Sequence, residues 1–211
     1  MISALLPAPV VVETAYSDPP QARLEPEEEA VIARAVESRR REFTTVRHCA
    51  RLALGRLGVP YRPLVPGLRG APSWPEGIVG SLTHCAGFRA AAVARAEDVL
   101  SLGIDAEPAL PLPEGVLDAI ALPAEQQRNT ALSTTRPGTP WDRILFSAKE
   151  SVYKTWFPLT HTFLDFSEAD LTLRPDGTFT AVLLVPSPLP TLDGHWHVHD
   201  GHLATAITVL R

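Results

Sequence analysis

The sequence of 211 residues is poor in cysteine and has no long apolar segment. Its two cysteines, Cys49 and Cys85, form no CxxC pair, which argues against a disulfide framework or a zinc knuckle and fits a reducing compartment. No apolar run is long enough to cross a membrane, and the N-terminus lacks the basic region of a signal peptide. We therefore expect a cytoplasmic protein that does not associate with membranes.

Several common catalytic motifs are also missing. The chain contains no GxxxxGK[ST], no GxGxxG after a strand, no GxSxG and no HExxH, so it is not an obvious P-loop enzyme, Rossmann dehydrogenase, serine hydrolase or zinc protease. A net charge of -5 argues against general nucleic-acid binding, although it leaves room for a local basic patch. Hydrophobic residues make up 45% of the chain, which is typical of a globular protein able to bury a core.

The order of apolar runs and breakers predicts an α+β fold, because helices and strands are mixed without βαβ alternation. Strands are expected at 10–12, 77–83, 90–94, 99–104, 196–200 and 203–209, and as a hairpin around the Pro-Asp-Gly turn within 171–179. Helices are expected from residue 26 to about 55 with a break allowed, at 114–120, from 124 onward, and at 141–157, where Pro158 should stop the helix. The proline-rich segment 108–113 is a candidate link between two halves.

The helix at 141–157 has an apolar stripe and a second, mixed face. The stripe, which we expect to face the core, contains Leu145, Ala148, Val152 and Trp156. Glu150 and Lys154 are one turn apart on the other side, within reach of each other. Three aromatic residues share that side, namely Phe146, Tyr153 and Phe157. Because a solvated face rarely carries three aromatic residues, we expect a carboxylate and an ammonium group in a lined site.

The segment Gly103-Ile-Asp-Ala-Glu107 carries two more carboxylates. On a strand, Asp105 and Glu107 point to the same face, where they repel each other unless a cation or proton lies between them. Oxygen ligands of this kind suit Mg²⁺. An isolated DxE segment is more often a solvated strand end, but Glu150 as a third carboxylate favours a metal site.

Basic residues and histidines form further candidate sites. On an unbroken helix Arg40, Arg47 and Arg51 share one face, which suits a phosphate site or a solvated basic surface. Thr83-His84 ends a predicted strand, where the histidine is either a phosphate ligand or a structural residue. The alternating His195, His197 and His199 indicate a half-exposed strand rather than a metal site, because no cysteine or carboxylate spacing supports zinc.

Together these segments resemble the Sfp-type 4′-phosphopantetheinyl transferases. That family has a G-[IV]-D-x-E segment followed by W-x-x-K-E-[AS]-x-x-K, which here read Gly103–Glu107 and Phe146–Lys154, with Phe146 in place of the tryptophan. Ser81-Leu-Thr-His84 resembles the family's S-[LI]-[ST]-H element. The residue sequences of segments 43–51 and 79–87 are most similar to those of the actinobacterial, PptT-like branch.

The resemblance implies two similar α+β halves related by a pseudo-two-fold axis, residues 1–107 and 108–211, with the active site in the cleft between them. It implies a monomeric enzyme that transfers 4′-phosphopantetheine from coenzyme A (CoA) to a serine of acyl or peptidyl carrier proteins and releases 3′,5′-ADP. It also implies dependence on Mg²⁺, with Mn²⁺ able to substitute. Two rival readings are a Mg²⁺-dependent hydrolase of CoA or nucleotide pyrophosphates and a non-catalytic CoA-binding protein.

The resemblance also assigns roles to individual residues. The metal ligands would be Asp105, Glu107 and Glu150, and the catalytic residues would be Asp105, Glu150 and Lys154. The CoA-binding residues would be Arg39, Arg47, Pro66, Gly67, Leu68, Arg69, Thr83, His84, Asp105, Ala106, Glu150 and Lys154.

Several assignments stay open. The family match favours Arg39 as the second phosphate ligand, whereas the helical wheel favours Arg40, so Arg39 would need a helix break near Glu42. Pro66 stands where a lysine is common, which leaves Arg69 to carry the charge. Glu150 would take the serine proton directly or through a metal-bound water.

Overall fold

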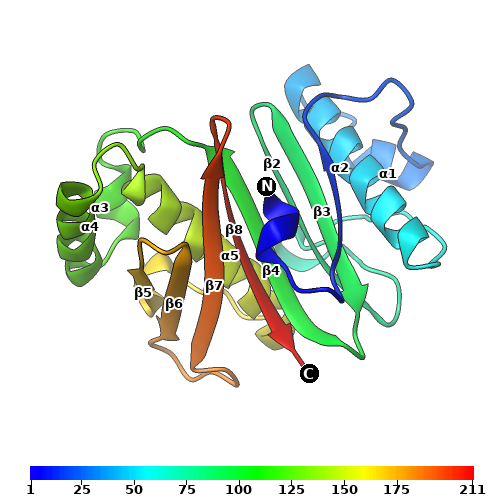
Figure 1. Ribbon diagram of the computed structural model, residues 1–211. Helices are drawn as coiled ribbons and strands as arrows, with labels where there is room; N and C mark the ends of the chain where they lie inside the picture. The colour runs from blue at the N-terminus through cyan, green and yellow to red at the C-terminus, as the bar shows by residue number, and fades with distance from the viewer.

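The computed structural model describes residues 1–211 and confirms the α+β class, with two antiparallel sheets (Figure 1). The strand order is β1-β3-β2 in the smaller sheet and β4-β8-β7-β6-β5 in the larger one. The sheets lie side by side, with helix α2 against the first and helix α5 against the second (Figure 1). None of the helices combines the length and the apolar character needed to cross a bilayer.

The smaller sheet consists of β1 (Val11–Ala15), β2 (Ile78–Cys85) and β3 (Phe88–Arg95). Helix α2 (Glu37–Arg56) buries Ala53 and Leu54 against Ile78 and Val93 of this sheet. The short helix α1 (Pro26–Val31) precedes α2, and the 3-10 helix η2 (Leu68–Gly70) lies in the loop before β2. This half therefore consists of one long helix packed on one antiparallel sheet.

The larger sheet consists of β4 (Val99–Pro108), β5 (Ala169–Leu173), β6 (Thr178–Leu183), β7 (Thr191–His199) and β8 (His202–Leu210). Helix α5 (Trp141–Thr160) covers it, and the predicted apolar stripe of Leu145, Ala148, Val152 and Trp156 is buried in the largest core cluster. The short α3 (Val116–Ile120), α4 (Pro123–Thr135) and the 3-10 helix η3 (Phe166–Glu168) complete this half.

The N-terminal 3-10 helix η1 (Ile2–Leu5) covers the other face of the larger sheet. Ile2 packs with Ala204 and Ala206 of β8, whereas Leu203 and Ile207 of the same strand belong to the core on the α5 side. This is the alternation expected of a strand buried on both faces.

Side chains of β2 join the two sheets. The Ser81 hydroxyl accepts a hydrogen bond from the backbone N–H of Ile104 at 3.1 Å, and the Thr83 hydroxyl accepts one from that of Ala106 at 2.9 Å. Because β4 pairs with β8, the strand that carries Asp105 belongs to the larger sheet. The division of the chain at residue 107 stays a prediction.

Most predicted elements are present, with three boundary corrections. The predicted helix from residue 26 is interrupted at 32–36, not near Glu42, and α2 then runs unbroken to Arg56. Strand β4 extends to Pro108, so Asp105 and Glu107 lie within it rather than after its end. Pro158 lies inside the last turn of α5, which ends at His161 in the left-handed region (φ 53°). A proline there removes only one backbone donor, and the helix closes one turn later.

Both predicted hairpins are confirmed. The Asp200-Gly201 pair that joins β7 and β8 has φ values of 51° and 74°, as a two-residue turn between twisted strands requires.

Candidate active site

Helix α5 lies directly on strand β4 at Gly103. A β-carbon at this position would lie 2.2 Å from the Ser151 carbonyl oxygen and 2.9 Å from the Thr155 backbone nitrogen, so only glycine permits the contact. Two residues earlier, the Ser101 hydroxyl donates a hydrogen bond to the Thr155 carbonyl oxygen at 2.7 Å. The glycine of the GIDxE segment thus brings the two acidic motifs together.

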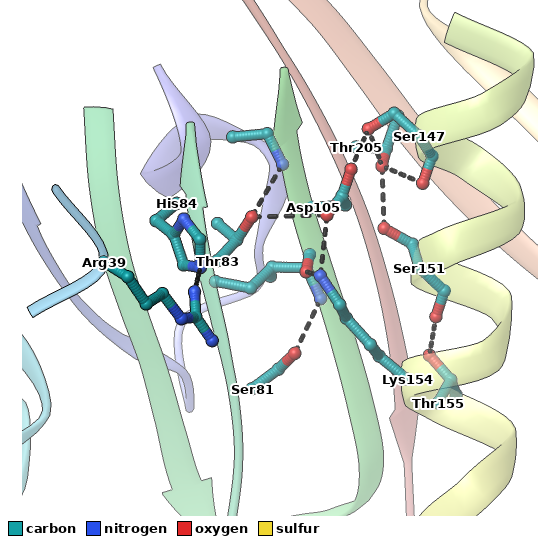
Figure 2. A network of polar contacts seen from close by, with 12 residues as sticks. Arg39, Ser81, Thr83, His84, Asp105, Ser147, Ser151, Lys154, Thr155 and Thr205 are labelled. Carbon is teal, nitrogen blue, oxygen red and sulfur yellow. Dashed lines mark hydrogen bonds and ion pairs between the residues drawn. The ribbon is translucent and has the colours of Figure 1, made fainter. Parts of the chain in front are cut away.

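Asp105 is buried at the centre of a polar network between β2, β4 and α5 (Figure 2). It accepts hydrogen bonds from the Lys154 ammonium group at 2.6 Å, the Ser147 hydroxyl at 2.8 Å and the Thr83 hydroxyl at 3.3 Å. Lys154 also donates to the Ile104 carbonyl oxygen at 3.2 Å. The structure therefore brings the predicted Asp105 and Lys154 into direct contact.

Glu107 and Glu150 lie beside this network, and only Glu107 has a hydrogen-bond partner. The Arg143 guanidinium group of α5 donates to Glu107 at 3.0 Å, whereas the half-buried Glu150 carboxylate has no hydrogen-bond or ion-pair partner. Burial raises the pKa of Glu107, and the neighbouring Asp105 raises it further. Burial likewise raises the pKa of Glu150, against the lowering effect of Lys154 and with an added raising effect of Asp105. The charge of Asp105 therefore acts on both of the other carboxylates.

The donor set suits a divalent cation, although it is not assembled around one. No three His, Cys, Asp or Glu side chains converge closely enough to bind a single ion, because Lys154 and Arg143 take up Asp105 and Glu107. Burial, and then the neighbouring Asp105, raise the pKa of Glu107 and Glu150, a cost of ionisation that a bound cation would offset, and oxygen ligands of this kind are those that Mg²⁺ prefers. The residues fit Mg²⁺ in chemistry.

A basic group lies on the β2 side of the network. Arg39 of α2 points at Nε2 of His84, and Figure 2 shows the two side chains meeting beside Thr83. On the other side of the ring, Nδ1 of His84 lies 3.3 Å from a Glu42 carboxylate oxygen. Burial lowers the pKa of His84, and Arg39 lowers it further. In Figure 2, Thr83 lies between this group and the Asp105–Lys154 pair.

The arginine series of α2 is divided between several roles. Arg40 donates to the Ile32 carbonyl oxygen at 2.8 Å, so it turns away from His84, and Arg39 reaches His84 without any helix break. Arg47 is only 7% exposed, lies 3.5 Å from the centre of the Phe43 ring, and its Nε has no partner. Burial lowers the pKa of Arg47 to about 10. An orphaned buried guanidinium donor is compatible with an anion ligand.

The segment 66–69, predicted to bind CoA, is held mainly through its backbone. The Gly67 N–H donates to the Ala71 carbonyl oxygen at 2.7 Å, and Pro66 forms a bridge with Pro72. Leu68 is exposed, and Arg69, at φ 52°, places its guanidinium group 4.9 Å from the centre of the Phe163 ring. The Thr83 hydroxyl and Ala106 N–H, both predicted CoA contacts, are bonded to each other.

A pocket of about 410 Å³ opens beside Glu150. Its walls come from α5, from the segment between α5 and β5, and from Arg69 of the first half. They include three aromatic side chains, which are Tyr153, Phe163 and Phe166. Of the three aromatic residues predicted on that side of α5, only Tyr153 lines this cavity, next to the acidic Glu150. Phe146 packs against the Phe166 ring, and Phe157 is buried.

The histidine-rich strand lies elsewhere. His195 and His197 line a separate pocket of about 480 Å³ that contains none of the predicted site residues. All three histidines of β7 are exposed, and the rings of His197 and His199 stack with centroids 5.9 Å apart. This arrangement is that of a half-exposed strand, as the alternation indicated.

The structure assigns positions to residues that the sequence reasoning passed over. Lys149, which precedes Glu150, is 2% exposed and forms an ion pair with Glu125, 1% exposed, at 2.9 Å. Lys149 follows Leu145 by four residues and precedes Val152 by three, so it lies on the buried stripe of α5. A buried ammonium group needs an acidic partner, and this spacing could have predicted one. Arg143 and Glu42 carried no such signal, because their partners are distant in sequence.

The chain is similar to known proteins over nearly its full length. Residues 27–94 match the model of the 4′-phosphopantetheinyl transferase N-terminal domain, and residues 101–208 match that of the 4′-phosphopantetheinyl transferase superfamily. The chain is 58% identical to 4′-phosphopantetheinyl transferase Svp of Streptomyces mobaraensis, over 99% of this chain and 89% of Svp. It is 49% identical to PptT of Mycobacterium tuberculosis (99% and 98% covered) and 48% identical to Npt of Nocardia iowensis (98% and 99%). With both halves matched in the expected order, the chain belongs to the 4′-phosphopantetheinyl transferase superfamily.

Proposed function

We propose that the protein transfers the 4′-phosphopantetheine group of CoA to a serine of acyl or peptidyl carrier proteins, releasing 3′,5′-ADP. The observation that carries this proposal is the Asp105–Lys154 pair, which Thr83 connects to the basic group of Arg39 and His84, together with the pocket at Glu150, one helical turn before Lys154 on α5. CoA consists of a phosphate-rich nucleotide and an uncharged pantetheine arm, and these two parts need a basic site and a less charged pocket. As CoA is an intracellular substrate, we place the enzyme in the cytoplasm, acting as a monomer.

The basic group would bind the nucleotide end of CoA. Arg39 and His84 present nitrogen donors suited to the 3′-phosphate, and Arg47 adds a buried guanidinium group. Segment 66–69 would hold the adenine largely through backbone groups, with Arg69 as its only cation. Thr83 and Ala106 lie between these residues and Asp105, so their contribution would be to position the network.

The pocket beside Glu150 would take the pantetheine arm. That arm is uncharged and carries amide groups, which suits a cavity lined by aromatic residues with a few polar groups at its edge. The arm would then leave its phosphate next to Asp105 and Lys154. Removing part of the wall with Phe163→Ala, at a residue that is 50% exposed, should raise the KM for CoA more than that for the carrier.

The chemistry is a phosphoryl transfer, in which charge neutralisation and positioning matter most. Asp105, Glu107 and Glu150 would hold Mg²⁺, or Mn²⁺ in its place, which supplies positive charge for the pyrophosphate. The serine oxygen forms a bond to the β-phosphorus as the bond from that phosphorus to the bridging oxygen breaks. Lys154 would stabilise the negative charge that develops on 3′,5′-ADP.

The serine proton needs an acceptor, and Glu150 is the candidate, directly or through water. Its carboxylate is unpaired, and burial raises its pKa, which makes it a better base than a surface glutamate. Glu150→Gln should abolish transfer while CoA still binds measurably. Turnover like that of the wild type would remove Glu150 from the mechanism.

The carrier would dock near the linker between the halves. Arg143 holds the carbonyl oxygens of Leu110 and Pro111 at 3.0 and 2.9 Å, so the linker is fixed beside Glu107, and Leu110 is 63% exposed. Leu110→Asp should raise the KM for the carrier and leave that for CoA unchanged. An unchanged carrier KM would exclude this surface.

The deciding experiment incubates the protein with CoA, Mg²⁺ and an apo carrier protein and measures intact mass. A transferase increases the mass of the carrier by one phosphopantetheine group. A pyrophosphate hydrolase consumes CoA and leaves the carrier unmodified, and a binding protein does neither. Panels of carriers from fatty-acid, polyketide and peptide systems would then define the partners.

A further inference from the structure

Glu42 is an acid placed inside a basic group. One of its carboxylate oxygens lies 3.3 Å from Nδ1 of His84 and 3.9 Å from Nη1 of Arg39, and the Glu42 side chain is only 24% exposed. An acidic side chain in a site that should attract phosphate calls for a physical reason, because a carboxylate and a phosphate in one site repel each other.

We propose that Glu42 is a positioning residue for His84, which makes the site selective for CoA that carries a 3′-phosphate. It would hold the Nδ1–H of the ring so that Nε2 faces Arg39 and the phosphate, and it would supply the negative charge that lets His84 gain a proton on binding. The inference rests on the proposed function, since the 3′-phosphate of CoA is the ligand concerned.

The hydrogen-bonding capacities of the ring lead to this role. Nε2 of His84 meets a guanidinium N–H of Arg39, so Nε2 is the acceptor and the proton of the neutral ring lies on Nδ1, facing Glu42. When a phosphate binds Arg39, Nε2 faces an acceptor and must carry a proton, which comes from solvent. The resulting imidazolium lies between two anions, Glu42 and the phosphate.

The charged groups around His84 show why Glu42 is needed. Arg39 and Glu42 face the ring from α2, Arg89 from β3 and Lys154 from α5. Burial and the three cations lower the pKa of His84, and Glu42 alone raises it. Without Glu42, protonation of the ring would depend entirely on the phosphate, and CoA would bind at a greater cost.

The first test compares KM values for CoA and for 3′-dephospho-CoA, from mildly acidic to alkaline pH, in the wild type and in Glu42→Gln. We expect the variant to raise the KM for CoA about three- to tenfold, as the loss of one partly exposed charge-assisted contact would do, with little change for dephospho-CoA. Because the pKa of His84 falls in the variant, the loss of CoA affinity with rising pH should begin at a lower pH. Glu37→Gln is the matched control, since Glu37 pairs with Arg41 on the same helix, at 3.6 Å, and should leave both KM values unchanged.

The second test isolates the route through His84. In a His84→Gln background, Glu42→Gln should add little to the rise in KM. Titration of the wild type with CoA in buffers of different ionisation enthalpy should show proton uptake, and this measurement needs no variant to fold.

Each alternative gives a different result. A lower KM for CoA in Glu42→Gln would mean that repulsion of the phosphate dominates, and an equal rise for both substrates would mean a structural role only. Additive effects with His84→Gln, or binding without proton uptake, would likewise overturn the inference. Failure of the wild type to modify a carrier would instead refute the proposed function, whereas transfer with an unchanged substrate ratio in Glu42→Gln would refute only the role of Glu42.

Discussion

Replacing Gly103 by alanine tests the contact on which the whole site is built. The added methyl group would lie 2.2 Å from the Ser151 carbonyl oxygen and 2.5 Å from Oγ1 of Thr155. Normal contact distances are about 3.5 Å, so α5 must retreat from β4 by roughly 1 Å. The backbone oxygen cannot rotate away as a side chain could, and the 2.7 Å bond from Ser101 to Thr155 would stretch with the helix.

These distances set the size of the effect. Overpacking of this kind costs about 1–3 kcal/mol, and a weakened buried hydrogen bond adds about 1 kcal/mol, so we expect a loss of about 3 kcal/mol in the free energy of unfolding. For a chain of this length that corresponds to a fall in Tm of roughly 6–12 °C. Because α5 carries Glu150 and Lys154, a shift of about 1 Å should also reduce kcat on the order of 100-fold.

Thermal unfolding and carrier modification measure the two effects separately. The control is Gly55→Ala in α2, where an added β-carbon meets nothing within 4 Å and φ is not positive. That variant should gain about 0.5–1 kcal/mol and keep full activity. If Gly103→Ala has the Tm and kcat of the wild type, the close contact of α5 and β4 does not exist in solution.

Three further predictions concern single groups of the site. Glu150→Gln should raise Tm at neutral pH, because the folded-state pKa of Glu150 is raised and ionisation of the group therefore lowers stability as pH rises through that pKa. The difference in Tm between the variant and the wild type should vanish in acid, and a difference that grows on acidification would contradict this sign. Thr83→Val should lower the free energy of unfolding by about 1–3 kcal/mol in urea titrations, because it leaves the buried N–H of Ala106 without an acceptor. Thr83→Ser keeps the hydroxyl and should be nearly neutral. Equal losses in both variants would mean that packing accounts for the effect. Lys149→Met should lower the free energy of unfolding by about 3–5 kcal/mol, because it leaves the charge of Glu125 buried without a counter-ion. Adding Glu125→Gln should recover part of this loss in thermal unfolding, and no recovery would mean that packing rather than charge accounts for it.

Much of the architecture could be predicted from local signals. The Asp200-Gly201 hairpin and the apolar stripe of α5 depend on residues within a few positions of one another, and both are as expected. Local signals do not set the boundary of an element that tertiary contacts extend. Strand β4 continues past Ile104 because β8 supplies hydrogen-bond partners as far as Pro108, which no local pattern reveals.

The sequence by itself determined the family and singled out Asp105, Glu107, Glu150, Lys154 and His84, because each motif is a contiguous segment and the order of the motifs is specific. The tertiary structure alone revealed Arg143 and Glu42 and decided the pairs: Asp105 with Lys154, Glu107 with Arg143, and His84 with Glu42. The partners in these pairs are 49, 36 and 42 positions apart in the chain, in that order. Such contacts depend on how the helices pack on the sheets, and helical or strand periodicity carries no information about them.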